Sequence, residues 1–152
     1  MPAYTRFASM IITSTIVMFG LMYLNTYQLD HVFFSETRAF MALVMGAVMA
    51  VIMMGFMWGM YPNKSANTGI LVGAAIVFAG SLYLVRSQAT VEDVAYMKAM
   101  IPHHSIAIMT STRANITDPR VRDLADRITE AQVSEIGEMK GLIADLEQRS
   151  DR

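Results

Sequence analysis

Between Arg38 and Lys64 the chain reads AFMALVMGAVMAVIMMGFMWGMYPN, a run of 25 residues (39–63) without Asp, Glu, Lys or Arg. A helix needs about 20 mostly apolar residues to cross the hydrocarbon core of a bilayer. Charged side chains are costly inside that core, so a run of this length and composition is typical of a transmembrane helix. The sequence therefore predicts a membrane-spanning helix near residues 39–61.

Two similar runs flank this segment. No charged residue occurs among residues 7–29 or 65–85, which are runs of 23 and 21 residues. Each is long enough to span a bilayer, and we predict helices near 7–27 and 67–86. The first run lacks an A-x-A cleavage pattern and is soon followed by another apolar run, which favours a retained helix over a signal peptide. Membrane lipid is therefore an expected partner.

The composition changes after Arg86. Residues 1–86 hold 4 Lys/Arg and 2 Asp/Glu, a net charge of +2, whereas residues 87–152 hold 8 and 11, a net charge of −3. We predict a three-helix membrane anchor over 1–88 and a small acidic domain over 89–152. Basic residues are too few and too scattered for a nucleic-acid surface, so no nucleic-acid partner is expected.

Three spans place the two ends of the chain on opposite sides of the membrane. With the N-terminus inside, the inner segments carry Arg6 and Lys64, whereas the first outer loop carries Asp30, Glu36 and Arg38. This weak positive-inside bias predicts a multi-pass protein of the bacterial inner (plasma) membrane, with its C-terminal domain on the periplasmic or extracellular side. The absence of Cys fits an oxidising compartment, although it fits a cytosolic domain too.

Helix-start signals divide the C-terminal domain. TVED at 90–93 resembles a capping box, and TDP at 117–119 supplies a capping side chain followed by proline in the first helical turn. We predict helices over about 91–115 and 119–148. The first contains Pro102, which removes one backbone donor and is expected to kink it.

These elements predict an all-α fold with a C-terminal antiparallel helical hairpin. With the turn near residue 117, Met97 comes level with Gly137, and Met100 with Ser134. A two-helix hairpin cannot bury its apolar stripe alone. We therefore expect self-association into a four-helix bundle, and a homo-oligomer.

The first predicted helix carries the motif MKAMIPHHSIAIM, which begins at Met97 and holds three thioethers and two imidazoles. These soft and borderline donors suit Cu(I) or Ag(I) better than Mg, Ca or Mn. At 100° per residue Met97, Met100 and His104 share one face, with His103 at its edge and Met109 on another side. The alternative is that the methionines fill core space and the histidines end in solvent.

Three blocks occur in the order of a known family. They are MIPHHxxAI from Met100, DPxVRxLAxxI from Asp118 and AQxxEIxxM from Ala131. Over about residues 90–145 the chain resembles the domain of unknown function 305 (DUF305) family. The resemblance implies a ferritin-like helical domain, often exported, that is linked to copper or silver binding and tolerance through Met and His.

The resemblance also names candidate ligands. A methionine is usual in the family at position 110, where this chain has Thr110 with Met109 beside it. Glu135 matches the family pattern, although a cap or a salt bridge to a neighbouring helix explains it equally well. The candidate metal residues are Met97, Met100, His103, His104, Met109, Glu135 and Met139.

These observations predict a membrane-anchored Cu(I)- or Ag(I)-binding protein for metal sequestration or delivery, with metal-exporting or metal-accepting proteins as possible partners. An enzyme is not expected, because the chain has no Glu-x-x-His, no His-Glu-x-x-His, no Cys and no Gly-rich phosphate loop. The alternative is a structural or accessory membrane protein whose bundle mediates assembly without metal. A bis-His haem carrier is disfavoured, since adjacent histidines cannot sandwich a porphyrin within one chain.

Overall fold

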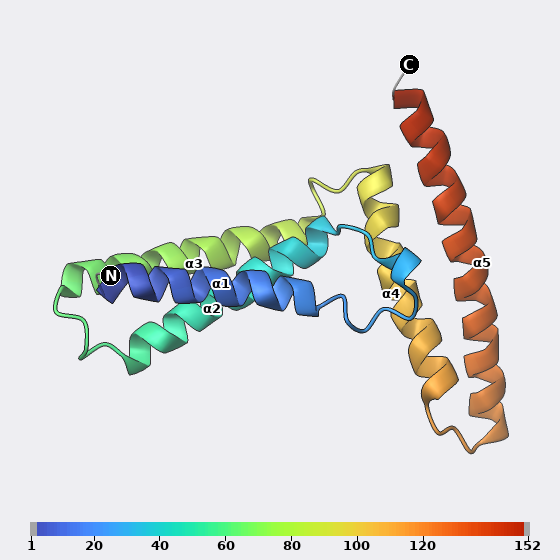
Figure 1. Ribbon diagram of the computed structural model, residues 1–152, viewed down its shortest axis with the longest axis horizontal. Helices are drawn as coiled ribbons and strands as arrows, with labels where there is room; N and C mark the ends of the chain where they lie inside the picture. The colour runs from blue at the N-terminus through green and yellow to red at the C-terminus, as the bar shows by residue number, and fades with distance from the viewer. Residues whose placement is uncertain (1–2, 151–152) are drawn as a thin grey trace. The chain divides into compact units, whose positions relative to one another are not determined.

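The computed structural model describes residues 3–150. Within this range the chain forms five α-helices and one short 3-10 helix, with no strand (Figure 1), so the all-helical prediction is confirmed. Contacts divide the chain into two compact units. The first runs to Met22 and resumes over Thr37–Thr90, and the second contains Tyr23–Glu36 and the residues from Val91 onward. Residues 23–36 thus group with the C-terminal helices, although the predicted boundaries placed them in the anchor.

The first unit contains three long apolar helices. They are α1 (Ala3–Leu21), α2 (Glu36–Phe56) and α3 (Lys64–Ser87), and each is long and apolar enough to cross a membrane. That part of the prediction is confirmed. The first helix ends at Leu21, short of the predicted residue 27, because the residues that follow make the contacts of the second unit instead of continuing the helix.

Small residues let α1 approach α2 closely. Gly46 is buried, and a Cβ atom at this position would overlap the hydroxyl of Thr15 on α1. Further along, Phe7 packs in a cluster with Met54 and Tyr61. The unit is therefore held together by apolar packing and a close helix approach.

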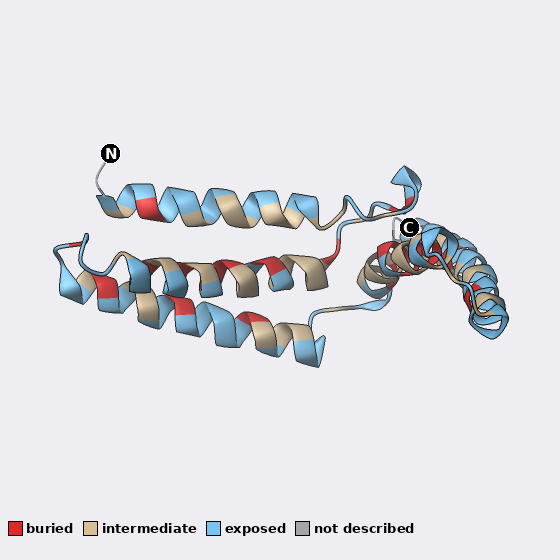
Figure 2. Ribbon diagram, turned by 90° about the horizontal axis from the view of Figure 1, so that it is seen from below, coloured by how far each residue is buried: buried red, intermediate tan, exposed pale blue. Residues whose placement is uncertain are grey.

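The second unit is built from α4 (Asp93–Arg113), α5 (Pro119–Ser150) and the 3-10 helix η1 (Leu29–His31). After the turn, α5 runs back along α4 (Figure 1). Helix α5 is mostly exposed and buries only Ala125, Ile136 and Ile143, whereas most residues of α4 are buried or intermediate (Figure 2 colours the chain by burial). The buried residues of α5 thus form a narrow apolar seam against α4. The seam consists of Met97, Ile101, Ile108, Ile136 and Ile143.

The helix starts agree with the sequence for α5 and differ for α4. The backbone N–H of Arg120 donates to Asp118 Oδ1 at 2.8 Å, and the Arg120 guanidinium lowers the pKa of that carboxyl. Helix α4 begins at Asp93, whereas the prediction placed its start near residue 91. Its N-cap residue is Glu92, whose side chain makes no capping hydrogen bond. The helix continues through Pro102 to its end.

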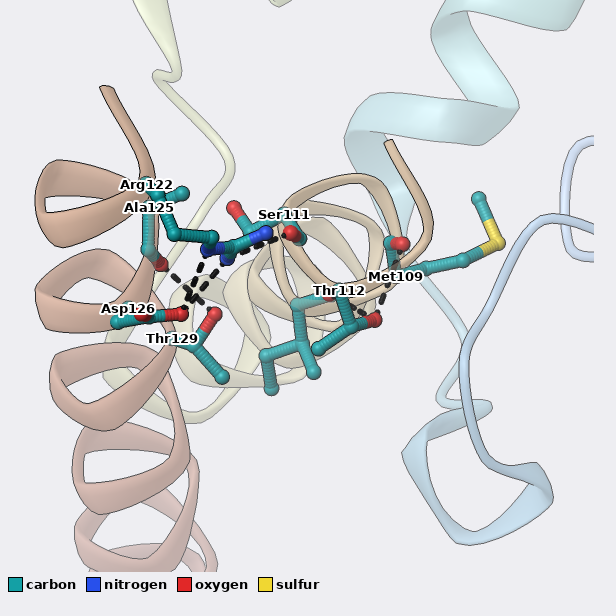
Figure 3. Close-up of polar contacts among 8 residues, drawn as sticks. Met109, Ser111, Thr112, Arg122, Ala125, Asp126 and Thr129 are labelled. Carbon is teal, nitrogen blue, oxygen red and sulfur yellow. Dashed lines mark hydrogen bonds and ion pairs between the residues drawn. The ribbon is translucent and has the colours of Figure 1, made fainter. Parts of the chain in front are cut away.

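The register between α4 and α5 differs from the prediction. Near the turn, the Arg122 guanidinium donates to the carbonyl of Ser111 at 2.9 Å (Figure 3). Towards the other end, Lys98 pairs at 2.7 Å with Glu147 rather than lying beside the segment near Gly137. The prediction assumed a fixed one-to-one register from the turn. The Lys98–Glu147 ion pair does not follow that register, which was therefore wrong.

Candidate metal-binding site

An open groove of about 800 Å³ lies between α4 and α5. We call it the α4–α5 groove. Its apolar lining includes Tyr96 from α4 and Leu142 from α5, and its rim carries carboxylates such as Glu138. The two helices therefore form a shallow, mostly apolar channel with acidic edges.

Five of the seven candidate ligands line this groove. Spacings of three and four residues place Met97, Met100 and His104 on the α4 wall, and Glu135 and Met139 lie opposite on α5. Three thioethers and one imidazole are thus gathered from two helices. The helical spacing predicted a shared face for the three α4 residues, and all three line the groove.

The other two candidates lie elsewhere. His103 is exposed and is not part of the groove lining, although its ring centroid lies 6.2 Å from that of His104. The Met109 side chain extends away from α5 (Figure 3), as its position on the helical wheel indicates. Within a single chain, neither residue joins the groove.

His104 is held by two hydrogen bonds. Its Nδ1 lies 3.0 Å from the carbonyl of Met100, and its Nε2 lies 2.6 Å from Glu135 Oε2. A carbonyl only accepts, so Nδ1 carries a proton. The contact between Nε2 and the carboxyl therefore needs a second proton, which is held by one or the other. Gln132 also donates to the same oxygen of Glu135, at 3.3 Å.

The donor set has a clear chemical character. Among residues 3–150, no three His, Asp or Glu side chains cluster in a way that could hold a metal ion. Besides carboxylates, the groove lining offers three thioethers and one imidazole, that of His104. Thioether sulfur and neutral imidazole form a soft, uncharged donor set.

A second cluster, which sequence reasoning missed, holds residues 23–36 against the α4–α5 pair. The backbone N–H of Tyr27 donates to Ser105 Oγ at 2.8 Å, and His31 Nδ1 lies 3.0 Å from the same hydroxyl. Lys140 pairs with Asp30 at 2.6 Å. We call these contacts the loop clasp. His31 is buried although it lies in a loop. No local pattern marks Ser105 as its partner, because the two lie 74 positions apart.

The loop clasp should weaken in acid. Burial lowers the pKa of His31 below its ordinary value of 6.5, although Asp30 raises it and Lys140 lowers it further. A lowered histidine pKa stabilises the folded form above pH 6.5, and the contribution is lost as the pH falls through the lowered pKa. The Lys140 hydrogen bond lowers the pKa of Asp30 below 3.8, so that contribution is lost only at still lower pH.

We therefore expect hydrogen exchange of residues 23–36, corrected for intrinsic rates, to speed up between pH 7 and pH 5. In a His31→Gln variant, which cannot take up this proton, the change should disappear. Equal protection of the wild-type loop at both pH values would contradict the role of His31.

The sequence of the chain was compared with known protein families and proteins. Residues 93–152 match the family described as a domain of unknown function (DUF305). The chain is also 36% identical to Uncharacterized protein L153 of Acanthamoeba polyphaga mimivirus over 102 residues, which cover 62% of this chain and 67% of that protein. The chain belongs to the DUF305 family. The DUF305 match includes the whole α4–α5 groove.

The similarity to the viral protein extends beyond the DUF305 domain. The domain match covers residues 93–152, which are 60 of the 152 residues of the chain. The match to the viral protein covers a larger share, 62% of the chain. Because the domain match already reaches residue 152, the remaining similarity lies before residue 93. No solved structure matches the chain.

Proposed function

We propose that this protein binds Cu(I) or Ag(I) in the α4–α5 groove and serves in metal sequestration or delivery. The observation that carries the proposal is the convergence of Met97, Met100, Met139 and His104 on one groove. Neutral sulfur and imidazole donors favour soft monovalent ions over hard divalent ones. The DUF305 resemblance supports the same chemistry and a ferritin-like domain.

His104 can offer only one nitrogen to a metal ion. Its Nδ1 is used by the carbonyl of Met100, so the donor atom is Nε2, which Glu135 covers at 2.6 Å. An ion bound at Nε2 displaces the proton that this pair shares. Glu135 then either moves aside or adds a carboxylate oxygen to the site, and a Glu135→Gln variant separates these two roles.

The setting proposed for this chemistry is a membrane. We propose that α1, α2 and α3 span the bacterial inner membrane and that the DUF305 domain lies on the periplasmic or extracellular side. The three apolar helices and the weak positive-inside bias support this arrangement. Metal-exporting or metal-accepting proteins are the expected partners for delivery.

A homo-oligomer is also part of the proposal. Leu124, Ile128, Val133 and Leu142 on α5 are each 38–56% exposed, which leaves apolar surface that a second copy would cover. A second copy would also supply an environment for His103 and Met109, which lie outside the groove of a single chain. The same exposed surface favours the second candidate function, an accessory membrane protein that assembles without metal.

Silver titration of the full-length protein in detergent tests the metal proposal, because Ag(I) is a soft monovalent probe that does not change oxidation state. We expect saturable uptake in competition with a thioether chelator, and no uptake of Mg²⁺. His103→Ala and Met109→Leu should retain uptake. Loss in either variant would assign binding to a site completed by a second copy. Failure of the wild type to bind Ag(I) would favour the accessory function.

A further inference from the structure

The loop between α1 and α2 exposes an unusual amount of apolar surface. Leu24 is 77% exposed, Leu29 92%, Val32 44% and Phe34 64%. All four lie within residues 24–34. Single exposed apolar side chains are common, but four large ones in one short loop usually mark a binding surface.

Three polar contacts of the same loop are made with α4 and α5. Asp30 is bound to Lys140 on α5, and the buried His31 contacts Ser105 on α4. Ser105 is fully buried and also accepts the backbone N–H of Tyr27. In a loop surrounded only by water, a buried histidine beside four exposed large apolar side chains is unusual.

The chain connectivity indicates what covers the exposed side chains. Residues 22–35 connect the end of α1 directly to the start of α2, two helices long and apolar enough to cross a membrane. A loop tied at both ends to spanning helices cannot leave the bilayer surface by more than its own length. Lipid is therefore the apolar phase within reach of Leu24, Leu29, Val32 and Phe34. Tyr27, under the Arg113 guanidinium at 5.8 Å, is a residue type enriched at that depth.

We propose that residues 24–34 are a membrane-interface wedge. Their apolar side chains enter the headgroup and upper acyl region of the bilayer, while the loop clasp grips α4 and α5. The wedge thus holds the DUF305 domain at the lipid surface. This inference rests on the proposed membrane insertion of α1 and α2, but it does not depend on metal binding.

Tryptophan fluorescence with brominated lipids tests the wedge. The chain has a single tryptophan, so Trp58→Phe provides a background without this fluorophore. In that background Leu29→Trp is the reporter, since a side chain 92% exposed tolerates replacement. Ile76→Trp on α3, which is 67% exposed, reports on the span, and Val121→Trp on α5, which is 49% exposed, is the matched control. The full-length variants are reconstituted in phosphatidylcholine vesicles brominated either near the headgroup or near the chain end.

We expect Leu29→Trp to emit at shorter wavelength than tryptophan in water and to lose most of its emission to shallow bromines. Ile76→Trp should be quenched by deep bromines, and Val121→Trp by neither. Water-like, unquenched emission from Leu29→Trp would overturn the wedge, as would equal quenching at Val121→Trp. Short-wavelength emission without quenching would also overturn it, because a second protein copy would then cover the loop. Loss of quenching at Ile76→Trp would instead reject the membrane insertion itself.

Discussion

Replacing Met97, Met100 and Met139 together with leucine should lower the affinity of the protein for Ag(I) and Cu(I) by about a hundredfold or more. Replacing a residue that only supports a metal ligand, without touching the metal, costs about 10–100-fold in metal affinity. The triple variant removes more, because it replaces every thioether that lines the groove. Leucine keeps nearly the volume of methionine, so the apolar seam that contains Met97 should survive. Competition titration of the full-length protein against a Cu(I) chelator measures the change.

Two matched variants give this experiment its controls. Met109→Leu makes the same chemical change outside the groove and should leave affinity unchanged. Glu135→Gln keeps the shape of the side chain while removing the carboxylate that contacts His104 at 2.6 Å. If Glu135 only covers Nε2, binding is retained. If Glu135 is a ligand, affinity falls. An unchanged affinity in the triple leucine variant would reject the groove as the metal site.

Ile101→Ala should destabilise the α4–α5 pair by about 2–5 kcal/mol, the usual cost of truncating a buried isoleucine to alanine. Ile101 is 0% exposed and belongs to the seam shared with Ile136 and Ile143. A loss of 2 kcal/mol or more raises the population of the open pair about thirtyfold or more. Hydrogen exchange of the α4 and α5 amides in the full-length protein reports that opening.

Ile128→Ala is the matched control for this substitution. It deletes the same atoms from a side chain that is 38% exposed on α5, so it should cost far less. Because the proposed homo-oligomer would cover Ile128, the comparison is made at a dilution at which single chains prevail. Comparable acceleration of exchange in the two variants under that condition would contradict the assignment of the seam as the core of the pair.

Local patterns sufficed for much of the site. The i+3 and i+4 spacings placed Met97, Met100 and His104 on one face and separated Met109 from it, and all three share the groove. Glu135 had two equal interpretations, and its 2.6 Å contact with His104 has the geometry of an ion pair. Helical periodicity repeats with every turn of the chain, so it can be read without knowing the partner helix.

Long-range contacts could not be read in this way. Lys98 with Glu147, and His31 with Ser105, join residues 49 and 74 positions apart. Which residues meet depends on the inclination of α4 to α5 and on the path of the loop, and neither is encoded in a local pattern. The predicted register near Gly137 was wrong for that reason.

The sequence by itself determined the five helices, the three charge-free runs long enough to span a bilayer and the face that carries sulfur and imidazole. These properties follow from hydrophobicity and from the period of the helix, which act within one segment. Only the tertiary structure decided that Glu135 covers His104, that His103 stays outside the groove and that residues 23–36 clasp α4 and α5. Those outcomes depend on packing between distant segments, where shape and hydrogen-bond partners select one arrangement among many that the local pattern allows.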